Sequence, residues 1–317
     1  MKKPIIKLIA LMFILVSSFV ICAGCQGSSA SSTPAVHVKI GVLPTISALP
    51  LYIADKEGYF KAENLDVELV NFNSALEQDA ALQTNQIDGY FSDPVNAITM
   101  INGGVNIAII NSPYVASSKN RMFAILVSPK SGIVAAADLR GVEVGIANAT
   151  ITEYLLDRML QNAGVNPNDI VGLDVKQIPT RLQLVTNGQI KAAVLPEPSV
   201  TMAESLGARS LIDDTDLDCP ETVIALSNTV MLQDPVLEKH FLQGLAKAAE
   251  RINSDSGGLM TTAAAYINIP QDVQSTYKIP QFPVKVAPAQ KQLDEIQTWM
   301  AQKHIIPAML PFERLVK

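Results

Sequence analysis

The chain has 317 residues, an acidic balance of 24 Lys and Arg against 30 Asp and Glu, and a hydrophobic fraction of 48%. This length is enough for two domains of about 100 to 200 residues, each with a sizeable core. The chain has a net charge of −6, few aromatic residues and no basic cluster. This composition argues against the class of nucleic-acid-binding proteins, which carry basic patches. We therefore expect an acidic globular protein with no nucleic-acid partner.

The first residues have the order of an export signal. Lys2, Lys3 and Lys7 precede an apolar run over residues 8–21, which is short for a membrane span of about 20 residues and ends at small residues. This pattern favours a cleaved signal over a permanent anchor. We predict that residues 1–24 are a signal peptide and that the protein works outside the cytoplasm.

The sequence Cys22-Ala23-Gly24-Cys25 resembles a bacterial lipoprotein processing box, although Cys22 stands where Leu is usual. The resemblance implies that Cys25 is acylated, with palmitate-type chains, and becomes the new N-terminus. Two or more chains tether a protein to a membrane lastingly, at about 0.8 kcal/mol per buried methylene. The alternative is an ordinary secreted protein cut near Gly24. Residues 25–35 are rich in Ser, Gly, Ala and Thr, which predicts a flexible tether on the extracytoplasmic face of the cell membrane.

Cysteine usage excludes an internal disulfide in the processed protein. Of the three cysteines, one lies in the predicted signal and one is the predicted anchor, so only Cys219 remains. Beyond the signal, no apolar run approaches the about 18 residues of a spanning helix. We expect a soluble body whose core holds the fold by itself.

From residue 36 onward, short β-rich runs alternate with segments of helical period, which predicts parallel sheets covered on both sides by helices. The alternation occurs as two series, over 36–120 and 121–222, and the segment 223–317 adds a returning strand and C-terminal helices. Strands are predicted over 36–43, 66–72, 89–91, 106–111, 122–127, 142–147, 171–178, 192–195 and 223–227, and helices over 48–56, 76–84, 95–101, 150–162, 180–186 and from 235 onward.

One internal similarity indicates two related lobes. Residues 82–87 lead through a short strand to Asp93-Pro94, and residues 184–190 lead through another to Pro196-Glu197-Pro198. The spacing of about 100 residues is too long for a solenoid repeat. We therefore predict an α/β fold with two lobes, where 36–120 and 223–317 form the first lobe and 121–222 forms the second. Ligands of such folds bind outside the carboxyl ends of the strands, in the cleft.

Several blocks resemble bacterial solute-binding proteins of the nitrate/sulfonate/taurine family, which also includes receptors for thiamine-pyrimidine precursors. The blocks are residues 49–60, 63–69, 138–145 and 188–198. Departures are Asn64 and Asn85 where Gly is usual, and Lys191 where Asp is usual; Asn tolerates the left-handed backbone of such turns.

The resemblance implies a two-lobed periplasmic binding protein fold of type II, with each lobe a mainly parallel sheet flanked by helices. It further implies a monomeric lipoprotein that closes on a small solute and delivers it to the permease and ATPase subunits of an ABC importer. No cofactor, metal or catalytic residue is expected.

Candidate ligand residues follow the predicted strand ends, where hydroxyls and free N–H groups at helix starts can cradle an anion or a polar ring. Arg181 is the candidate cation, and Asp93 and Glu197 occupy matched positions in the two series. For Ser47, Ser74 and Thr150, simple helix capping is the alternative, and for Arg181 it is a solvent-facing position. The predicted set is Thr45, Ser47, Ser74, Ser92, Asp93, Asn148, Thr150, Thr152, Arg181 and Glu197.

Two alternatives to an importer receptor stay open. The same fold family contains a pyrimidine synthase with a cysteine-rich motif and an active-site His, but this chain has no such motif, and His37, His240 and His304 lie outside the predicted cleft loops. A sensor module without an importer is the other alternative. The ligand class also stays open, because hydroxyls and Arg181 favour a sulfonate or nitrate, whereas the carboxylates and tyrosines favour a pyrimidine, a flavin or an amine.

Overall fold

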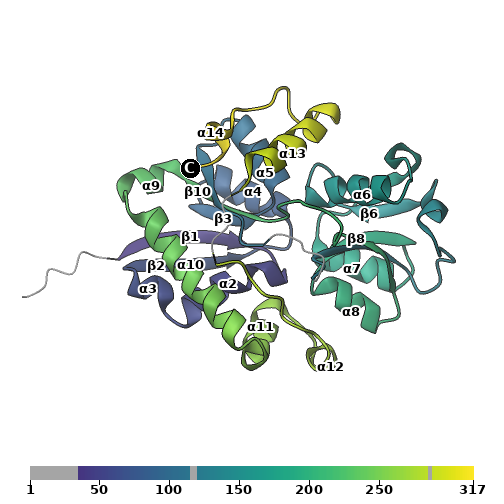
Figure 1. Cartoon of the computed structure of the whole chain (residues 1–317), viewed down its shortest axis with the longest axis horizontal. Helices are drawn as coiled ribbons and strands as arrows, with labels where there is room; N and C mark the ends of the chain where they lie inside the picture. The colour runs from purple at the N-terminus through teal and green to yellow at the C-terminus, as the bar shows by residue number, and fades with distance from the viewer. Residues whose placement is uncertain (1–34, 115–119, 285–287) are drawn as a thin grey trace, which may run out of the picture. The chain divides into compact units, whose positions relative to one another are not determined.

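Each lobe of the computed structural model is built on a five-stranded mixed sheet (Figure 1). The structure describes residues 35–114, 120–284 and 288–317, and residues 35–317 form one compact unit. The two sheets have equivalent strand orders, β2-β1-β3-β10-β4 in the first lobe and β7-β6-β8-β5-β9 in the second. Their bounds are β1 (Val36–Val42), β2 (Leu65–Asn71), β3 (Gly89–Ser92), β4 (Ile107–Asn111), β5 (Phe123–Val127), β6 (Glu143–Ile146), β7 (Val171–Asp174), β8 (Ala192–Pro196), β9 (Arg209–Asp213) and β10 (Val223–Ser227).

One strand in each sheet runs against the others. In the first lobe β1 pairs in parallel with β2 and β3, and β10 is antiparallel to both β3 and β4. In the second lobe β6 pairs in parallel with β7 and β8, and β5 is antiparallel to β8 and β9. The chain passes from the first lobe to the second before β5, and it returns to the first lobe before β10; we call these two segments the crossings. The antiparallel strands β5 and β10 therefore each follow a crossing directly. The predicted two-lobed α/β fold with mainly parallel sheets is thereby confirmed.

Helices cover both sheets (Figure 1). The C-terminal part of the chain adds to the first lobe, where α10 packs on α2 and α3, and α13 packs on α5. Helices of the first lobe are α2 (Leu49–Lys56), α3 (Tyr59–Ala62), α4 (Ala75–Gln83), α5 (Pro94–Asn102), α9 (Asn228–Gln233), α10 (Leu237–Ser254), α11 (Met260–Ile267), α12 (Gln271–Gln274), α13 (Gln290–Gln302) and α14 (Phe312–Leu315). Those of the second lobe are α6 (Ile151–Asn162), α7 (Ile178–Thr186) and α8 (Ser199–Ser205).

The internal sequence similarity corresponds to equivalent places in the two sheets. The first copy leads from α4 into β3 and the second from α7 into β8, and each of these strands is third in its sheet. Asn85 has a φ of 54°, and Asn64 a φ of 60°, so both occupy the left-handed region expected from the usual glycines.

Two element predictions were wrong in their bounds. The strand predicted over 171–178 ends at Asp174, because Pro179 suits the first turn of a helix and α7 already begins at Ile178. The C-terminal helices begin at Asn228 instead of 235, where Ser227 caps α9 by accepting a hydrogen bond from the N–H of Thr229 at 3.2 Å.

Within residues 35–114, 120–284 and 288–317, no helix combines the length and the apolar character needed to cross a membrane. Cys219 is a buried free cysteine. The predicted signal peptide, the predicted lipidation site Cys25 and nearly all of the predicted tether lie outside the described residues.

Candidate functional site

A cavity lies where the two lobes meet, with about 50 Å³ of room for the centres of water molecules. At about 10 to 15 Å³ per water in this measure, it holds roughly three to five waters, which matches a solute of a few heavy atoms. Both lobes and the returning crossing contribute to its walls. The lining residues are Leu43, Thr45, Ser74, Ala75, Phe91, Ser92, Asp93, Phe123, Ala147, Thr150, Ile151, Thr152, Lys176, Ile178, Arg181, Pro196, Glu221 and Thr222.

The cavity brings together most of the residues predicted from the sequence. Seven of them line it: Thr45, Ser74, Ser92, Asp93, Thr150, Thr152 and Arg181.

The other three predicted residues lie elsewhere. Ser47 is buried behind Thr45, with the two hydroxyl oxygens 3.1 Å apart. Asn148 lines a neighbouring cavity of about 180 Å³, and Glu197 lies among charged partners in the second lobe.

The first lobe contributes helix N-termini and hydroxyls. Ser74 caps α4 by accepting a hydrogen bond from the N–H of Glu77 at 3.3 Å, so this residue both caps a helix and faces the cavity. The hydroxyl of Ser92 is buried and has no hydrogen-bond partner among the described residues. Buried polar atoms are almost always paired, so an unpaired hydroxyl in a cavity wall indicates a place for a ligand or for water.

Asp93 is the acid of this wall. Its carboxylate caps α5 by accepting a hydrogen bond from the N–H of Asn96 at 2.9 Å, and only 5% of the residue is exposed. Burial raises its pKa to about 7, against the smaller opposing effect of backbone N–H groups of Asn96, Ile151 and Val95. Asp79, which accepts a hydrogen bond from the Asn96 side chain at 2.6 Å, also has a pKa raised to about 7, by burial and by Asp93.

In the second lobe, α6 begins at the cavity. Thr150 caps this helix by accepting from the N–H of Thr152 at 3.3 Å, and its own hydroxyl donates to the carbonyl of Ala147 at 2.8 Å. The carboxylate of Glu153 accepts from the N–H of Ala149 at 2.8 Å. A hydroxyl and a carboxylate therefore both cap the start of this helix, each shifted by one residue from an ideal capping box. These bonds fix the start of a twelve-residue helix, whose N-terminal dipole favours negative charge.

Arg181 of α7 is the buried cation of the site. Only 1% of the residue is exposed, which rules out the solvent-facing alternative. Its Nε donates to the carbonyl of Val194 at 3.2 Å and its Nη1 to the carbonyls of Val175 and Lys176 at 2.7 and 3.3 Å. Burial lowers its pKa to about 10, so the guanidinium stays charged at neutral pH. Across the described part of the chain, Arg181 forms no ion pair with a carboxylate, which is unusual for a buried charge.

The returning crossing supplies the remaining polar wall, with Glu221 and Thr222 directly before β10. Burial and the neighbouring Asp214 raise the pKa of Glu221 well above its usual range, and both of its carboxyl oxygens are buried without a hydrogen-bond partner among the described residues. Asp214 accepts hydrogen bonds from the backbone N–H groups of Met122 and Phe123 at 3.0 and 2.7 Å. The two crossings are thus joined beside the cavity. The hydroxyl of Thr222 is buried and unpaired among residues 35–114, 120–284 and 288–317.

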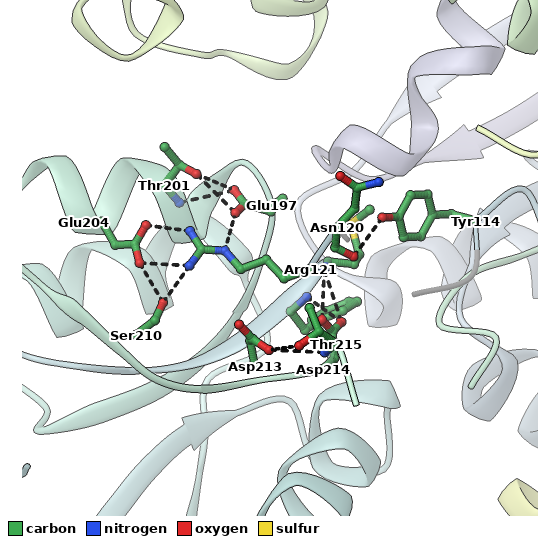
Figure 2. A network of polar contacts seen from close by, with 12 residues as sticks. Tyr114, Asn120, Arg121, Glu197, Thr201, Glu204, Ser210, Asp213, Asp214 and Thr215 are labelled. Carbon is green, nitrogen blue, oxygen red and sulfur yellow. Dashed lines mark hydrogen bonds and ion pairs between the residues drawn. The ribbon is translucent and has the colours of Figure 1, made fainter. Parts of the chain in front are cut away.

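The carboxylate of Glu197 takes part in a network of hydrogen bonds and ion pairs next to the start of β5 (Figure 2). Its carboxylate accepts a hydrogen bond from Arg121 Nε at 2.8 Å and from the hydroxyl of Thr201 at 2.9 Å. Arg121 Nη1 also donates to Glu204 at 2.9 Å. The side chain of Glu197 therefore holds the chain where it enters the second lobe, although its backbone carbonyl accepts from the N–H of Ile46 in the first lobe at 3.0 Å. Equivalent chain positions in the two lobes have different surroundings.

The two lobes contact each other beyond the cavity. At one side the N–H of Ile178 donates to the carbonyl of Asn73 at 3.2 Å, close to the start of α7 and α4. At another side Trp299 of α13 donates from Nε1 to Asp157 of α6 at 2.9 Å, and Lys303 pairs with Asp157 at 2.8 Å and with Glu153 at 3.2 Å. These contacts hold the two lobes together beside the cavity.

Sequence reasoning missed several lining residues. Lys176 lies inside the strand predicted over 171–178, whereas Glu221 and Thr222 precede a predicted strand, so none of the three follows a predicted strand end. The apolar walls are formed by Phe91 inside β3 and Phe123 at the start of β5, and neither residue has a local signal. Among the described residues, no group of three or more His, Cys, Asp and Glu side chains is arranged to hold a metal ion.

The equivalent sheets, the crossings and the cavity between lobes define a two-lobed periplasmic-binding-protein fold. A family model described as the NMT1-like family matches residues 31–267, and the chain belongs to this family. Comparison with curated protein sequences gives no match.

Solved structures support the fold. The alkanesulfonate-binding protein SsuA from Xanthomonas axonopodis pv. citri, bound to MOPS, is 19% identical with a TM-score of 0.74, covering 90% of this chain and 97% of its own. The periplasmic nitrate-binding protein NrtA from Synechocystis PCC 6803 is 14% identical with a TM-score of 0.70, covering 88% of this chain and 84% of its own. The desulfurization enzyme DSZB is 13% identical with a TM-score of 0.67, covering 89% of this chain and 96% of its own. Binding proteins and an enzyme thus share this fold.

Proposed function

We propose that this protein is the extracytoplasmic solute-binding lipoprotein of an ABC importer, and that it captures a small polar solute in the cavity between its lobes. The observation that carries the proposal is a small cavity between the lobes, lined by a buried cation without a carboxylate partner, Arg181, and by the unpaired hydroxyls of Ser92 and Thr222. Buried polar groups without partners cost free energy in the empty protein, and a solute that pairs them recovers it. The fold and the NMT1-like family support the same function.

The cavity favours an anionic group on the solute. Arg181 and the start of α6 both offer positive charge or N–H groups, as expected for a sulfonate or nitrate receptor. A large sulfonate does not fit into about 50 Å³ unless the lobes move apart, so we expect a solute of a few heavy atoms. The second candidate is a nitrogen heterocycle such as a pyrimidine, which Asp93 and the aromatic ring of Phe91 favour.

Catalysis finds little support in this cavity. No His lines it, and Cys219, the free cysteine of the described part of the chain, is absent from the lining residues. Burial and nearby acids raise the pKa of the Cys219 thiol well above its usual range, which opposes its use as a nucleophile. We therefore propose a receptor, with the mature protein tethered through Cys25 and delivering its solute to membrane permease and ATPase subunits.

A titration of the full-length protein in detergent tests this function. Trp299 is the one tryptophan of the chain and lies in the contact between lobes, so its fluorescence reports solute-induced movement. The probes are nitrate, short alkanesulfonates, aminopyrimidines, thiamine and riboflavin. We expect saturable binding within one chemical class, weakened at least about tenfold by Arg181→Met if the solute is an anion. If none of these probes, nor any other small charged solute, binds, the receptor function is wrong.

A further inference from the structure

Two buried carboxyl groups lie side by side on the returning crossing. Asp214 directly follows β9 of the second lobe, and Glu221 stands two residues before the start of β10 in the first lobe. Both residues are 0% exposed. Their side chains are hydrogen-bonding neighbours, and Glu221 also lines the cavity between the lobes. The pair therefore joins the two ends of a segment about which the lobes turn relative to each other.

The two carboxyl groups differ in their hydrogen-bond donors. Asp214 accepts from the N–H groups of Met122 and Phe123 at 3.0 and 2.7 Å, so the end of the other crossing holds this carboxylate. Both oxygens of Glu221 are buried without a donor among the described residues. Two ionised carboxylates have no hydrogen to share, so they bond to each other only through an added proton. Because N–H donors favour the charged form of an acid, that proton belongs on Glu221, which donates to Asp214.

No cation compensates a second negative charge at this place. Among residues 35–114, 120–284 and 288–317, no Lys, Arg or His forms an ion pair with Asp214 or Glu221. Burial and Asp214 both raise the pKa of Glu221, and nothing opposes them. Adjacent buried carboxyl groups do not both ionise readily. The other titratable groups around the pair and along the cavity wall are Tyr114, Asp213, Cys219 with Arg158 and Asp218, Asp93, Lys176 and Arg181.

We propose that Asp214 and Glu221 share one proton, and that this proton favours the arrangement of the lobes seen in the structure. With the proton in place, hydrogen bonds run from Glu221 at the first lobe through Asp214 to the N–H groups of Met122 and Phe123 in the second. When the proton passes to solvent, two adjacent negative charges repel each other and this link breaks. The equilibrium then shifts toward separated lobes. The pair is a pH-sensitive hinge, which goes beyond the proposed function and does not depend on the identity of the solute.

Isotope-edited infrared spectroscopy locates the proton in the solute-free, full-length protein in detergent. Glutamate labelled with carbon-13 at the side-chain carboxyl distinguishes Glu bands from Asp bands. We expect one Glu band of a protonated acid to remain at pH 7, where exposed glutamates are ionised. The band should disappear in Glu221→Gln. It should persist in the matched control Glu197→Gln, because the buried carboxylate of Glu197 is already paired with Arg121 at 2.8 Å.

The lobe arrangement is followed in the same samples by fluorescence and small-angle X-ray scattering. Trp299 reports it because its Nε1 donates across the lobes to Asp157 at 2.9 Å. As the pH rises through the range in which the infrared band is lost, the fluorescence should shift and the radius of gyration should increase. Glu221→Gln keeps the shape and an N–H donor toward Asp214 at every pH, so it should show neither change. Asp216→Asn removes an exposed acid of the same crossing and should behave like the wild type.

Thermal unfolding gives a further readout with a definite sign. The folded protein raises the pKa of Glu221 above its ordinary 4.5, so this acid does not destabilise the fold below pH 4.5. Stability is lost as the pH rises through the raised pKa. The melting temperature of Glu221→Gln should therefore increase relative to that of the wild type as the pH is raised from 5 to 9.

Three results would overturn the proposal. If the wild type has no protonated Glu band at pH 7, the pair does not share a proton. If the wild-type lobe signals change at a pH different from that of the band, the proton does not control the hinge; this comparison needs no variant. The same holds if the lobe signals of Glu221→Gln keep the wild-type pH dependence. None of these measurements uses a solute, so this proposal and the receptor function fail separately.

Discussion

The contact between α6 and α13 should set how tightly the protein holds its solute. Asp157 is 5% exposed and accepts a hydrogen bond from Trp299 Nε1 at 2.9 Å while pairing with Lys303 at 2.8 Å. Since α6 belongs to the second lobe and α13 packs on α5 of the first, this contact must break when the lobes separate. The perturbation that we propose is Asp157→Asn, which keeps the shape and removes the charge.

The structure allows a rough magnitude. A hydrogen bond to a charged group contributes about 1.5 to 3 kcal/mol, against about 0.5 to 1.5 for a neutral one, and asparagine can still accept from Trp299. The Lys303 pair adds only about 0 to 1 kcal/mol, because the lysine side chain is 34% exposed and can still pair with Glu153. The expected loss is about 1 to 2 kcal/mol, or about 5- to 30-fold.

Whether the loss of about 1 to 2 kcal/mol appears in the solute affinity or in the stability of the solute-free protein depends on whether the lobes move. If the contact forms only in the enclosed state, Asp157→Asn raises the apparent Kd about 5- to 30-fold by calorimetry and changes the melting temperature of the solute-free protein little. The control is Glu295→Gln on the same helix, where the exposed pair with Lys291 spans 3.8 Å. An unchanged Kd together with a lower melting temperature of the solute-free protein would refute the reasoning, since the contact would then persist without solute.

Three further predictions concern the anchor, the buried acid and the first sheet. Cys25→Ser should move the protein from the membrane fraction to the soluble fraction and prevent palmitate labelling; membrane retention would argue against lipidation at this residue. Asp93→Asn should raise the melting temperature at pH 8 and much less at pH 4. The reason is that the pKa of Asp93 is about 7 in the folded protein, against an ordinary 3.8. Below pH 4 the protonated acid does not destabilise the fold, whereas above pH 7 the buried carboxylate lowers the free energy of unfolding by up to about 4 kcal/mol. Equal effects at both pH values would contradict the assignment. Gly89→Ala should destabilise the fold by about 1 to 3 kcal/mol in urea titrations, because its Cβ would lie 2.6 Å from the carbonyl oxygen of Ala225, and an unchanged midpoint would contradict this packing.

Much of the fold could be predicted from the sequence because local patterns carried it. Alternating strand and helix periods gave the α/β class, and the similarity of residues 82–87 to residues 184–190 gave two related lobes. Asn64 and Asn85 were expected in left-handed turns for a steric reason that needs no tertiary information. The end of β7 at Asp174 was missed because residues 175–178, which mix apolar Val175 and Ile178 with two polar residues, suit a strand and a helix start equally.

The candidate site could be predicted only in part. Residues at strand ends and helix starts, such as Thr150 and Asp93, have a local signature, and the structure places them in one cavity. Tertiary surroundings decide the rest. Glu197 has the same local signature as Asp93, but Arg121 from a distant segment engages its carboxylate. Thr222 enters the cavity only because the chain crosses back before β10, which no local pattern reveals.

The central claim is that the two lobes close on a small solute held in this cavity. Its most direct test is small-angle X-ray scattering of the full-length protein in contrast-matched detergent, without and with a saturating amount of the probe that binds most tightly. The account predicts that the radius of gyration falls when the solute is added, and that Asp157→Asn needs more solute for the same change. An unchanged radius of gyration at proven saturation would contradict closure on the solute.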